Sequence, residues 1–100
     1  MSFVIKWTPL ADETFDETIE FIKTHWNEDI INRFVQDTFS TIDLIKENPK
    51  LYKTVTGFEN VRKGSVNEFI SLFYRINQNN IELLYFWDNR KNPNTSLLKE

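Results

Sequence analysis

The apolar and polar positions at the start of the chain follow two different periods. FVIKW, residues 3–7, alternates and is β-prone, which predicts a first strand. The Thr8-Pro9 pair predicts that a helix starts here, because threonine is a good N-cap and proline suits the first helical position. Apolar residues then recur at helical spacing, with carboxylates on the other side. This apolar stripe consists of Leu10, Phe15, Ile19, Ile22 and Trp26.

A second helical pattern follows almost at once. Asn27 is a good N-cap, and Glu28 and Asp29 place negative charge in the first turn, where the helix dipole favours it. Apolar residues recur at threes and fours until Asn48-Pro49, where proline disfavours helix in the preceding residue. Because the connection is very short, the two helices are predicted to form an antiparallel hairpin with an acidic outer face and an apolar inner face.

The pattern returns to that of strands after a loop that runs to about Glu59. Three segments are β-prone: NVRKGSV (60–66), FISLFYRI (69–76) and IELLYFW (81–87). Asn77 to Asn80 predict a hairpin loop between the last two, since asparagine tolerates the positive φ of tight turns. The predicted fold is α+β: an N-terminal strand, an antiparallel helical hairpin, then a three-stranded antiparallel meander, in a single domain over residues 1–100.

Strict alternation assigns the side chains of the last two strands to two faces. One predicted face holds Ile70, Leu72, Tyr74, Ile76, Ile81, Leu83, Tyr85 and Trp87. The other holds Phe69, Phe73, Arg75, Leu84 and Phe86, among others. A helical hairpin covers only one face, so these five residues are candidates for contact with a partner, in a groove or at a dimer surface. Alternatively, the C-terminal tail or the long loop covers them.

The composition excludes several kinds of site. The chain has 100 residues, 40% of them apolar, and no cysteine, so disulfides and thiolate metal sites are excluded. One histidine, His25, cannot form a histidine cluster, and Gly57 and Gly64 alone cannot form a phosphate loop. No run approaches the ~18 apolar residues of a membrane span, and MSFVIKW is no secretory signal. We therefore expect a cytoplasmic protein without a cofactor or a membrane partner.

The charges are distributed unevenly around a net charge of -3. Residues 1–47 contain four basic and ten acidic side chains, whereas residues 48–100 contain eight basic and five acidic ones. Arg62 and Lys63 are adjacent, so a regular strand points them to opposite faces, and Arg90 follows the last strand. These residues are either ordinary solvated surface or cations around an RNA phosphate, whose charge they would stabilise during cleavage. No acid-base group with a pKa near neutrality accompanies them.

In element order and local sequence, the chain resembles the RelE/ParE toxins of bacterial type II toxin-antitoxin systems, also labelled plasmid-stabilisation proteins. The most specific match is ISLFYRI followed by WDNRKNP. The resemblance implies a helical hairpin against an antiparallel sheet, and a cognate antitoxin whose C-terminal segment wraps the toxin in a hetero-oligomer. RelE-like members cut mRNA on the ribosome without a metal. ParE-like members inhibit DNA gyrase and are not enzymes.

Only part of the RelE catalytic pattern carries over. Arg62 and Lys63 match its basic strand residues, and Arg90 matches its arginine after the last strand. Ser71 replaces a further arginine, and no Tyr or His follows Trp87 to transfer a proton. With the acidic pI near 5.2, this favours a ParE-like growth inhibitor that binds gyrase. The alternatives are a RelE-like endoribonuclease with catalytic Arg62, Lys63 and Arg90, and a degenerate toxin that only binds its antitoxin.

Overall fold

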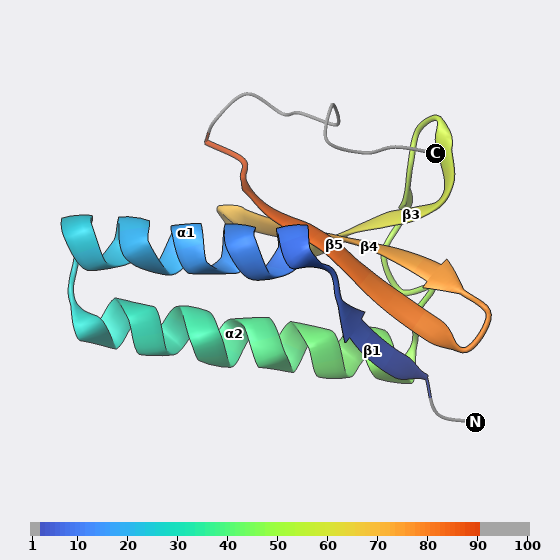
Figure 1. Ribbon diagram of the computed structural model, residues 1–100, viewed down its shortest axis with the longest axis horizontal. Coiled ribbons are helices and arrows are strands. Elements are labelled where there is room, and N and C mark those ends of the chain that lie inside the picture. The colour runs from blue at the N-terminus through green and yellow to red at the C-terminus, as the bar shows by residue number, and fades with distance from the viewer. Residues whose placement is uncertain (1–2, 91–100) are drawn as a thin grey trace.

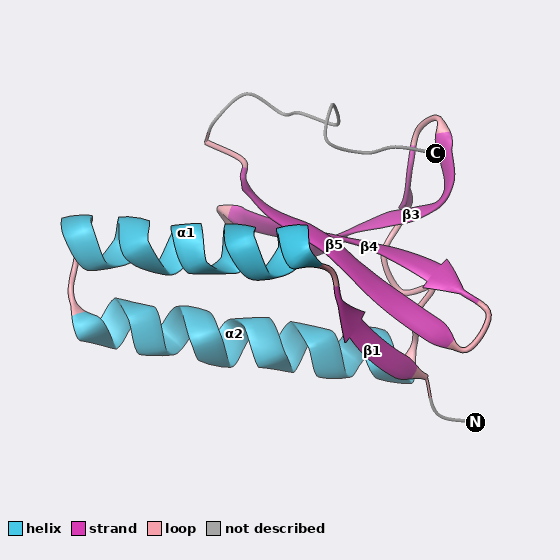
Figure 2. Ribbon diagram, viewed as in Figure 1, coloured by secondary structure: helices cyan, strands magenta, loops and turns pink. Residues whose placement is uncertain are grey.

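The computed structural model describes residues 3–90 and places a helical hairpin on one face of a five-stranded sheet (Figures 1 and 2). The elements in chain order are β1 (Val4–Trp7), α1 (Pro9–His25), α2 (Glu28–Glu47), β2 (Thr54–Val55), β3 (Phe58–Ser65), β4 (Ile70–Asn77) and β5 (Asn80–Asp88). In Figure 1 the end of the hairpin where α1 and α2 are joined extends past the sheet.

The sheet is larger than the predicted meander. Its strand order is β1-β5-β4-β3-β2, with β1 parallel to β5 and the other pairs antiparallel. The α+β class, the first strand and the helical hairpin are therefore confirmed, but a simple three-stranded meander is wrong. The connection between the parallel strands β1 and β5 runs through both helices and then through β2, β3 and β4. β2 has only two residues, too few to give a pattern in the sequence.

Both helices start at the predicted caps. Thr8 Oγ1 accepts a hydrogen bond from the Ala11 N–H at 3.1 Å, and Asn27 Oδ1 accepts one from the Ile30 N–H at 3.2 Å. The second helix ends at Asn48, directly before a proline, as predicted. Within the part of the chain that the structure describes, neither helix is long and apolar enough to cross a membrane.

The main core lies between the helices and the sheet. Its fully buried side chains include Ile45 of α2, Leu72 and Tyr74 of β4, and Ile81 and Leu83 of β5. At the β1 edge, aromatic rings extend this core. Their contacts are Trp7 with Phe15 at 5.3 Å, Phe15 with Phe86 at 5.3 Å and Phe15 with Phe34 at 5.4 Å between centroids.

A bulge in β5 changes the predicted faces. Phe73 pairs with Tyr85 and Tyr74 with Leu83, so Leu84 is an extra residue opposite β4. One extra residue reverses the alternation beyond it. Phe86 therefore turns into the helix-covered core, where it is only 2% exposed, and Tyr85 joins Phe73 on the opposite face. The prediction that Phe86 lies on the open face, and Tyr85 on the covered one, was wrong.

The same bulge moves Trp87, which packs with the smaller cluster on the second face. That cluster contains buried Val61, Phe73 and Tyr85, and the two rings of Phe73 and Tyr85 stack at 4.6 Å. The predicted β4–β5 hairpin is present, with Asn77 paired to Asn80. The residue with positive φ is Gln78 (56°), not an asparagine.

The start of α1 takes the place of β1 beside the second half of β5. The β1–β5 pairing ends at Trp7 and Leu83. The Thr8 hydroxyl then donates to the carbonyls of Leu83 (2.8 Å) and Leu84 (3.0 Å) at the bulge. Further along, the Phe86 N–H donates to Thr14 Oγ1 at 2.9 Å. These contacts hold the first half of α1 against β5. The second half of α1 continues past the last of these contacts, at Thr14.

Candidate functional site

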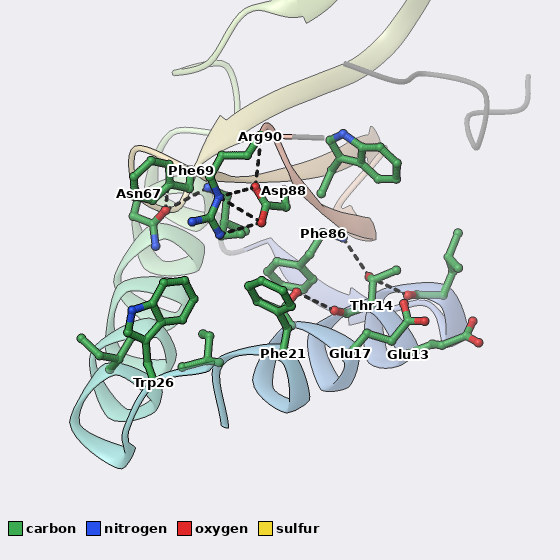
Figure 3. Close-up of a pocket in the computed structure, with 16 residues that line it drawn as sticks. Glu13, Thr14, Glu17, Phe21, Trp26, Asn67, Phe69, Phe86, Asp88 and Arg90 are labelled. Atoms are coloured by element: carbon green, nitrogen blue, oxygen red, sulfur yellow. Dashed lines mark hydrogen bonds and ion pairs between the residues drawn. The ribbon is translucent and has the colours of Figure 1, made fainter. Parts of the chain in front are cut away.

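A groove lies between the second half of α1 and the end of β5 (Figure 3). Its volume is about 850 Å³, and the segment from Asn67 to Ile70 and the start of α2 complete its walls. In Figure 3, Phe69, Asp88 and Arg90 lie on one side, and Phe21 and Glu17 on the other. The groove exists because the pairing of β1 with β5 ends at Leu83, before the bulge. Within residues 3–90, no strand therefore lies along this edge of the second half of β5, and the sheet-facing side of the second half of α1 stays uncovered.

Aromatic side chains with large exposed areas gather in this groove. Phe21 is 41% exposed, Trp26 is 50% exposed and Phe69 is 40% exposed, and all three line it. The rings of Phe21 and Trp26 meet edge to face, with centroids 5.8 Å apart. Exposed aromatic residues that form one concave surface indicate a binding site rather than ordinary surface.

Arg90 lies among these aromatic rings. Its guanidinium carbon is 4.4 Å from the centroid of the Phe69 ring, 5.7 Å from Trp26 and 5.9 Å from Phe21. Nη2 of the guanidinium also forms an ion pair with Asp88 at 2.7 Å. This hydrogen-bonded pair raises the pKa of Arg90. The charge of Arg90 is therefore compensated within its own segment.

Two asparagines hold the wall that carries Arg90. The Asn89 N–H donates to the Phe69 carbonyl at 2.7 Å, and Asn89 Nδ2 donates to Ser71 Oγ at 2.7 Å. Asn67 Oδ1 accepts hydrogen bonds from the N–H groups of Phe69 and Ile70, both at 2.8 Å. Asp88 Oδ1 in turn accepts the backbone N–H of Arg90 at 2.9 Å. The Asp88–Arg90 segment is thus fixed against the beginning of β4.

The other two candidate cations lie elsewhere. Arg62 donates to the carbonyl of Tyr52 at 2.6 Å, beside the end of α2. Lys63 projects on the opposite face, with Nζ 5.9 Å from the centroid of the Phe73 ring. Regular strand geometry predicted these opposite directions, and the structure confirms them. Arg62, Lys63 and Arg90 therefore contact three different sets of residues and do not surround one phosphate-sized space.

The match to protein families settles the class of the chain. The family model described as ParE toxin of type II toxin-antitoxin system, parDE, matches residues 5–93. The chain belongs to the ParE toxin family. The predicted resemblance to RelE/ParE toxins is therefore confirmed, and the protein is a type II toxin. No curated protein sequence matches it significantly.

Solved structures share the fold of this ParE-family toxin at low sequence identity. One, from the chromosomal ParDE TA system of P. aeruginosa, has a TM-score of 0.73 at 16% identity and covers 86% of this chain and 95% of that chain. Another, from the E. coli DinJ-YafQ toxin-antitoxin complex, has a TM-score of 0.64 at 11% identity and covers 94% and 100%. The YoeB dimer from Staphylococcus aureus gives 0.57 at 16% identity and covers 83% and 92%.

The predicted partner residues of the toxin are divided between two places. Phe69 lies in the groove, and Phe86 contributes to its floor although its ring is buried. Phe73 is buried on the second face under Tyr85, and Leu84 and Arg75 are half-buried. Phe73 and Leu84 stay together on the second face, whereas the bulge turns Phe86 into the core and Phe69 lies in the groove, so the five residues do not form one open face. Whether the tail covers the second face concerns residues 91–100, outside the described residues.

The toxin offers little for proton transfer or metal chemistry in residues 3–90. Burial raises the pKa of Tyr74 to about 12, and its hydroxyl donates to the Pro49 carbonyl at 2.7 Å. Burial also raises the pKa of Tyr85 to about 12. His25 stacks on Phe21 at the joined end of the hairpin, 4.2 Å between centroids. The described residues contain no cluster of His, Asp and Glu that could hold a metal ion.

Several residues of the groove carry no local signal in the sequence. Glu13 and Glu17 are exposed on the carboxylate side of α1, as a solvated helix surface predicts, and they also line the groove. The sequence pattern placed Trp26 on the inner stripe of the helix, but Trp26 is half exposed beyond the end of the sheet. Phe21 falls outside that stripe, between Ile19 and Ile22. A large apolar residue off the core stripe was the available signal for a second contact surface.

Proposed function

We propose that this toxin inhibits growth by binding DNA gyrase in the cytoplasm, and that a cognate antitoxin neutralises it. ParE-like toxins act on gyrase by binding, and the chain belongs to the ParE toxin family over residues 5–93. The observation that carries the proposal is the separation of the three candidate catalytic cations. Arg62 is hydrogen-bonded to the loop before β2, Lys63 lies on the other face and Arg90 is paired with Asp88.

The state of two of the three tyrosines, Tyr74 and Tyr85, supports binding over cleavage. A catalytic acid or base works best when its pKa lies near the working pH. Tyr74 and Tyr85 both have a pKa near 12 and are buried, so neither exchanges a proton readily at neutral pH. Metal-independent RNA cleavage needs such a group, because the 2′-hydroxyl must lose a proton and the leaving oxygen must gain one. Binding to gyrase needs neither.

An antitoxin partner is supported by two observations. Structures that share this fold include the E. coli DinJ-YafQ toxin-antitoxin complex. The toxin itself exposes an aromatic groove of about 850 Å³, a form of surface that protein partners cover. The expected product is a hetero-oligomer in which the antitoxin covers part of the toxin.

One observation favours the alternative, an endoribonuclease that acts on ribosome-bound mRNA. Lys63 is exposed on the face that also carries Tyr85, so one cation remains accessible there. A single lysine stabilises a phosphate as a point charge only, without the bidentate geometry of arginine. Arg62 and Arg90 would both have to leave their present partners to join it.

Induced expression in a bacterial host distinguishes the two functions. We expect gyrase trapped covalently on DNA within minutes, with mRNA intact by ribosome profiling. Codon-linked mRNA cuts without trapped gyrase would overturn the proposal in favour of the nuclease. Normal growth without the antitoxin would leave only a module that binds the antitoxin.

A further inference from the structure

The groove combines apolar walls with an acidic rim. Four ionisable side chains line it: Glu13, Glu17, Asp88 and Arg90. Asp88 and Arg90 neutralise each other through their ion pair. Within residues 3–90, Glu13 and Glu17 take part in no ion pair. They are four residues apart on α1, so they lie one above the other on the same side of the helix. The rim therefore presents two carboxylates without counter-charges.

The aromatic walls also favour a cation. Trp26 and Phe21 are both exposed in the groove, and the Arg90 guanidinium already lies 5.7 Å and 5.9 Å from their ring centroids. Aromatic faces attract guanidinium and ammonium groups and equally accept aliphatic chains. A volume of about 850 Å³ falls in the range of ligand pockets and accommodates several large side chains.

From this geometry we propose that the groove receives a cationic amphipathic segment of the antitoxin. Its apolar side chains would enter between Phe21, Trp26 and Phe69, and its Lys or Arg side chains would pair with Glu13 and Glu17. This inference rests on the proposed function for the existence of an antitoxin. The acidic rim disfavours nucleic acid and anionic lipid, which would bring negative charge against two carboxylates. A purely apolar segment would leave the carboxylates partly desolvated and unpaired.

Fluorescence anisotropy with two synthetic probes tests the charge of the occupant. The first probe is a short labelled peptide with leucines on one helical face and lysines on the other. The second has glutamate in place of every lysine. We expect the full-length toxin to bind the lysine peptide at least about tenfold more tightly at low salt, with the preference declining as salt rises. Equal binding of the two peptides, or tighter binding of the glutamate peptide, would overturn the proposal.

A matched pair of double variants locates the charge effect. Glu13→Gln with Glu17→Gln removes the rim carboxylates, whereas Asp16→Asn with Glu20→Gln removes two carboxylates from the same helix outside the groove. Both change the net charge by the same amount. We expect the first variant to weaken the lysine peptide by about fivefold or more, and the second by less than about twofold. Equal losses would show that only net charge matters and would contradict a specific site.

A second matched pair tests the apolar walls. Trp26 and Phe39 are each 50% exposed, but only Trp26 lines the groove. Trp26→Ser should abolish most binding of the lysine peptide, whereas Phe39→Ser should retain it. If the toxin's own residues 91–100 or a second copy occupied the groove, neither probe would bind tightly and neither pair would differ. That result would overturn this inference alone, because growth arrest and gyrase trapping are measured independently of peptide binding.

Discussion

At the scale of single residues, Arg90 shows how context determines the use of a charge. The sequence places it after the last strand, where RelE-like nucleases carry an arginine that contacts RNA. In the structure its guanidinium pairs with Asp88 and lies 4.4 Å from the Phe69 ring. The two residues thereby neutralise each other and form one wall of the groove. Arg90 is better suited to shaping a protein-binding surface than to holding a free phosphate.

Phe86 and Phe69 provide a direct test of the residue assignments. Phe86 is buried among Trp7, Phe15 and Phe34, so Phe86→Ala should lower the free energy of unfolding by about 3–5 kcal/mol. Phe69 is 40% exposed, so Phe69→Ala should cost about 1 kcal/mol or less. Urea unfolding of both variants measures the difference. Similar losses would contradict the change of face at the bulge.

The tyrosines predict a loss of stability in alkali. Tyr74 and Tyr85 have a pKa near 12 when folded and about 10 when unfolded. Their contribution is complete below about pH 10 and is lost as the pH rises towards 12, because only the unfolded chain then releases these protons. Each tyrosine should reduce the free energy of unfolding by up to roughly 1.4 kcal/mol per pH unit.

Urea unfolding between about pH 9 and pH 12 measures this slope, and Tyr85→Phe should reduce it. Tyrosinate absorbance in the folded protein should report the late titration directly. A slope that Tyr85→Phe leaves unchanged would contradict the assignment of a raised pKa to Tyr85.

At the scale of elements, the junction between β1, α1 and β5 organises the site. Thr8 caps α1 and donates to the β5 carbonyls at the bulge, and Thr14 accepts the Phe86 N–H. The sequence could predict the cap, because threonine before proline has a local meaning. It could not predict the bulge, because LLYFW is apolar at every position and an extra residue leaves no break in the alternation.

The two caps of the helical hairpin should therefore differ in importance. Thr8→Ala removes the cap and the contacts with Leu83 and Leu84, so we expect a loss of about 1–2 kcal/mol in stability. Asn27→Ala removes an exposed cap that bonds only to Ile30, with an expected loss of about 0.5–1 kcal/mol. Thermal or urea unfolding compares them. A larger loss for Asn27→Ala would refute the role of Thr8 as the tie between helix and bulge.

At the scale of the whole molecule, the groove is the feature that sequence patterns could not reveal. Its walls come from α1, the start of α2, the β3–β4 connection and the end of β5, which are far apart along the chain. The sequence did predict the first strand, the helical hairpin, the β4–β5 hairpin and the opposite directions of Arg62 and Lys63. These depend on local periodicity, whereas the parallel β1–β5 pairing and the groove depend on how distant segments meet.

On the function proposed above, this toxin acts by binding gyrase and does not cut RNA. The most direct test adds the purified full-length toxin to purified gyrase and relaxed plasmid DNA. We expect that supercoiling is inhibited and that gyrase-linked DNA breaks accumulate, while a parallel sample of ribosome-bound mRNA stays intact. Unimpaired supercoiling together with cleavage of the ribosome-bound mRNA would contradict it.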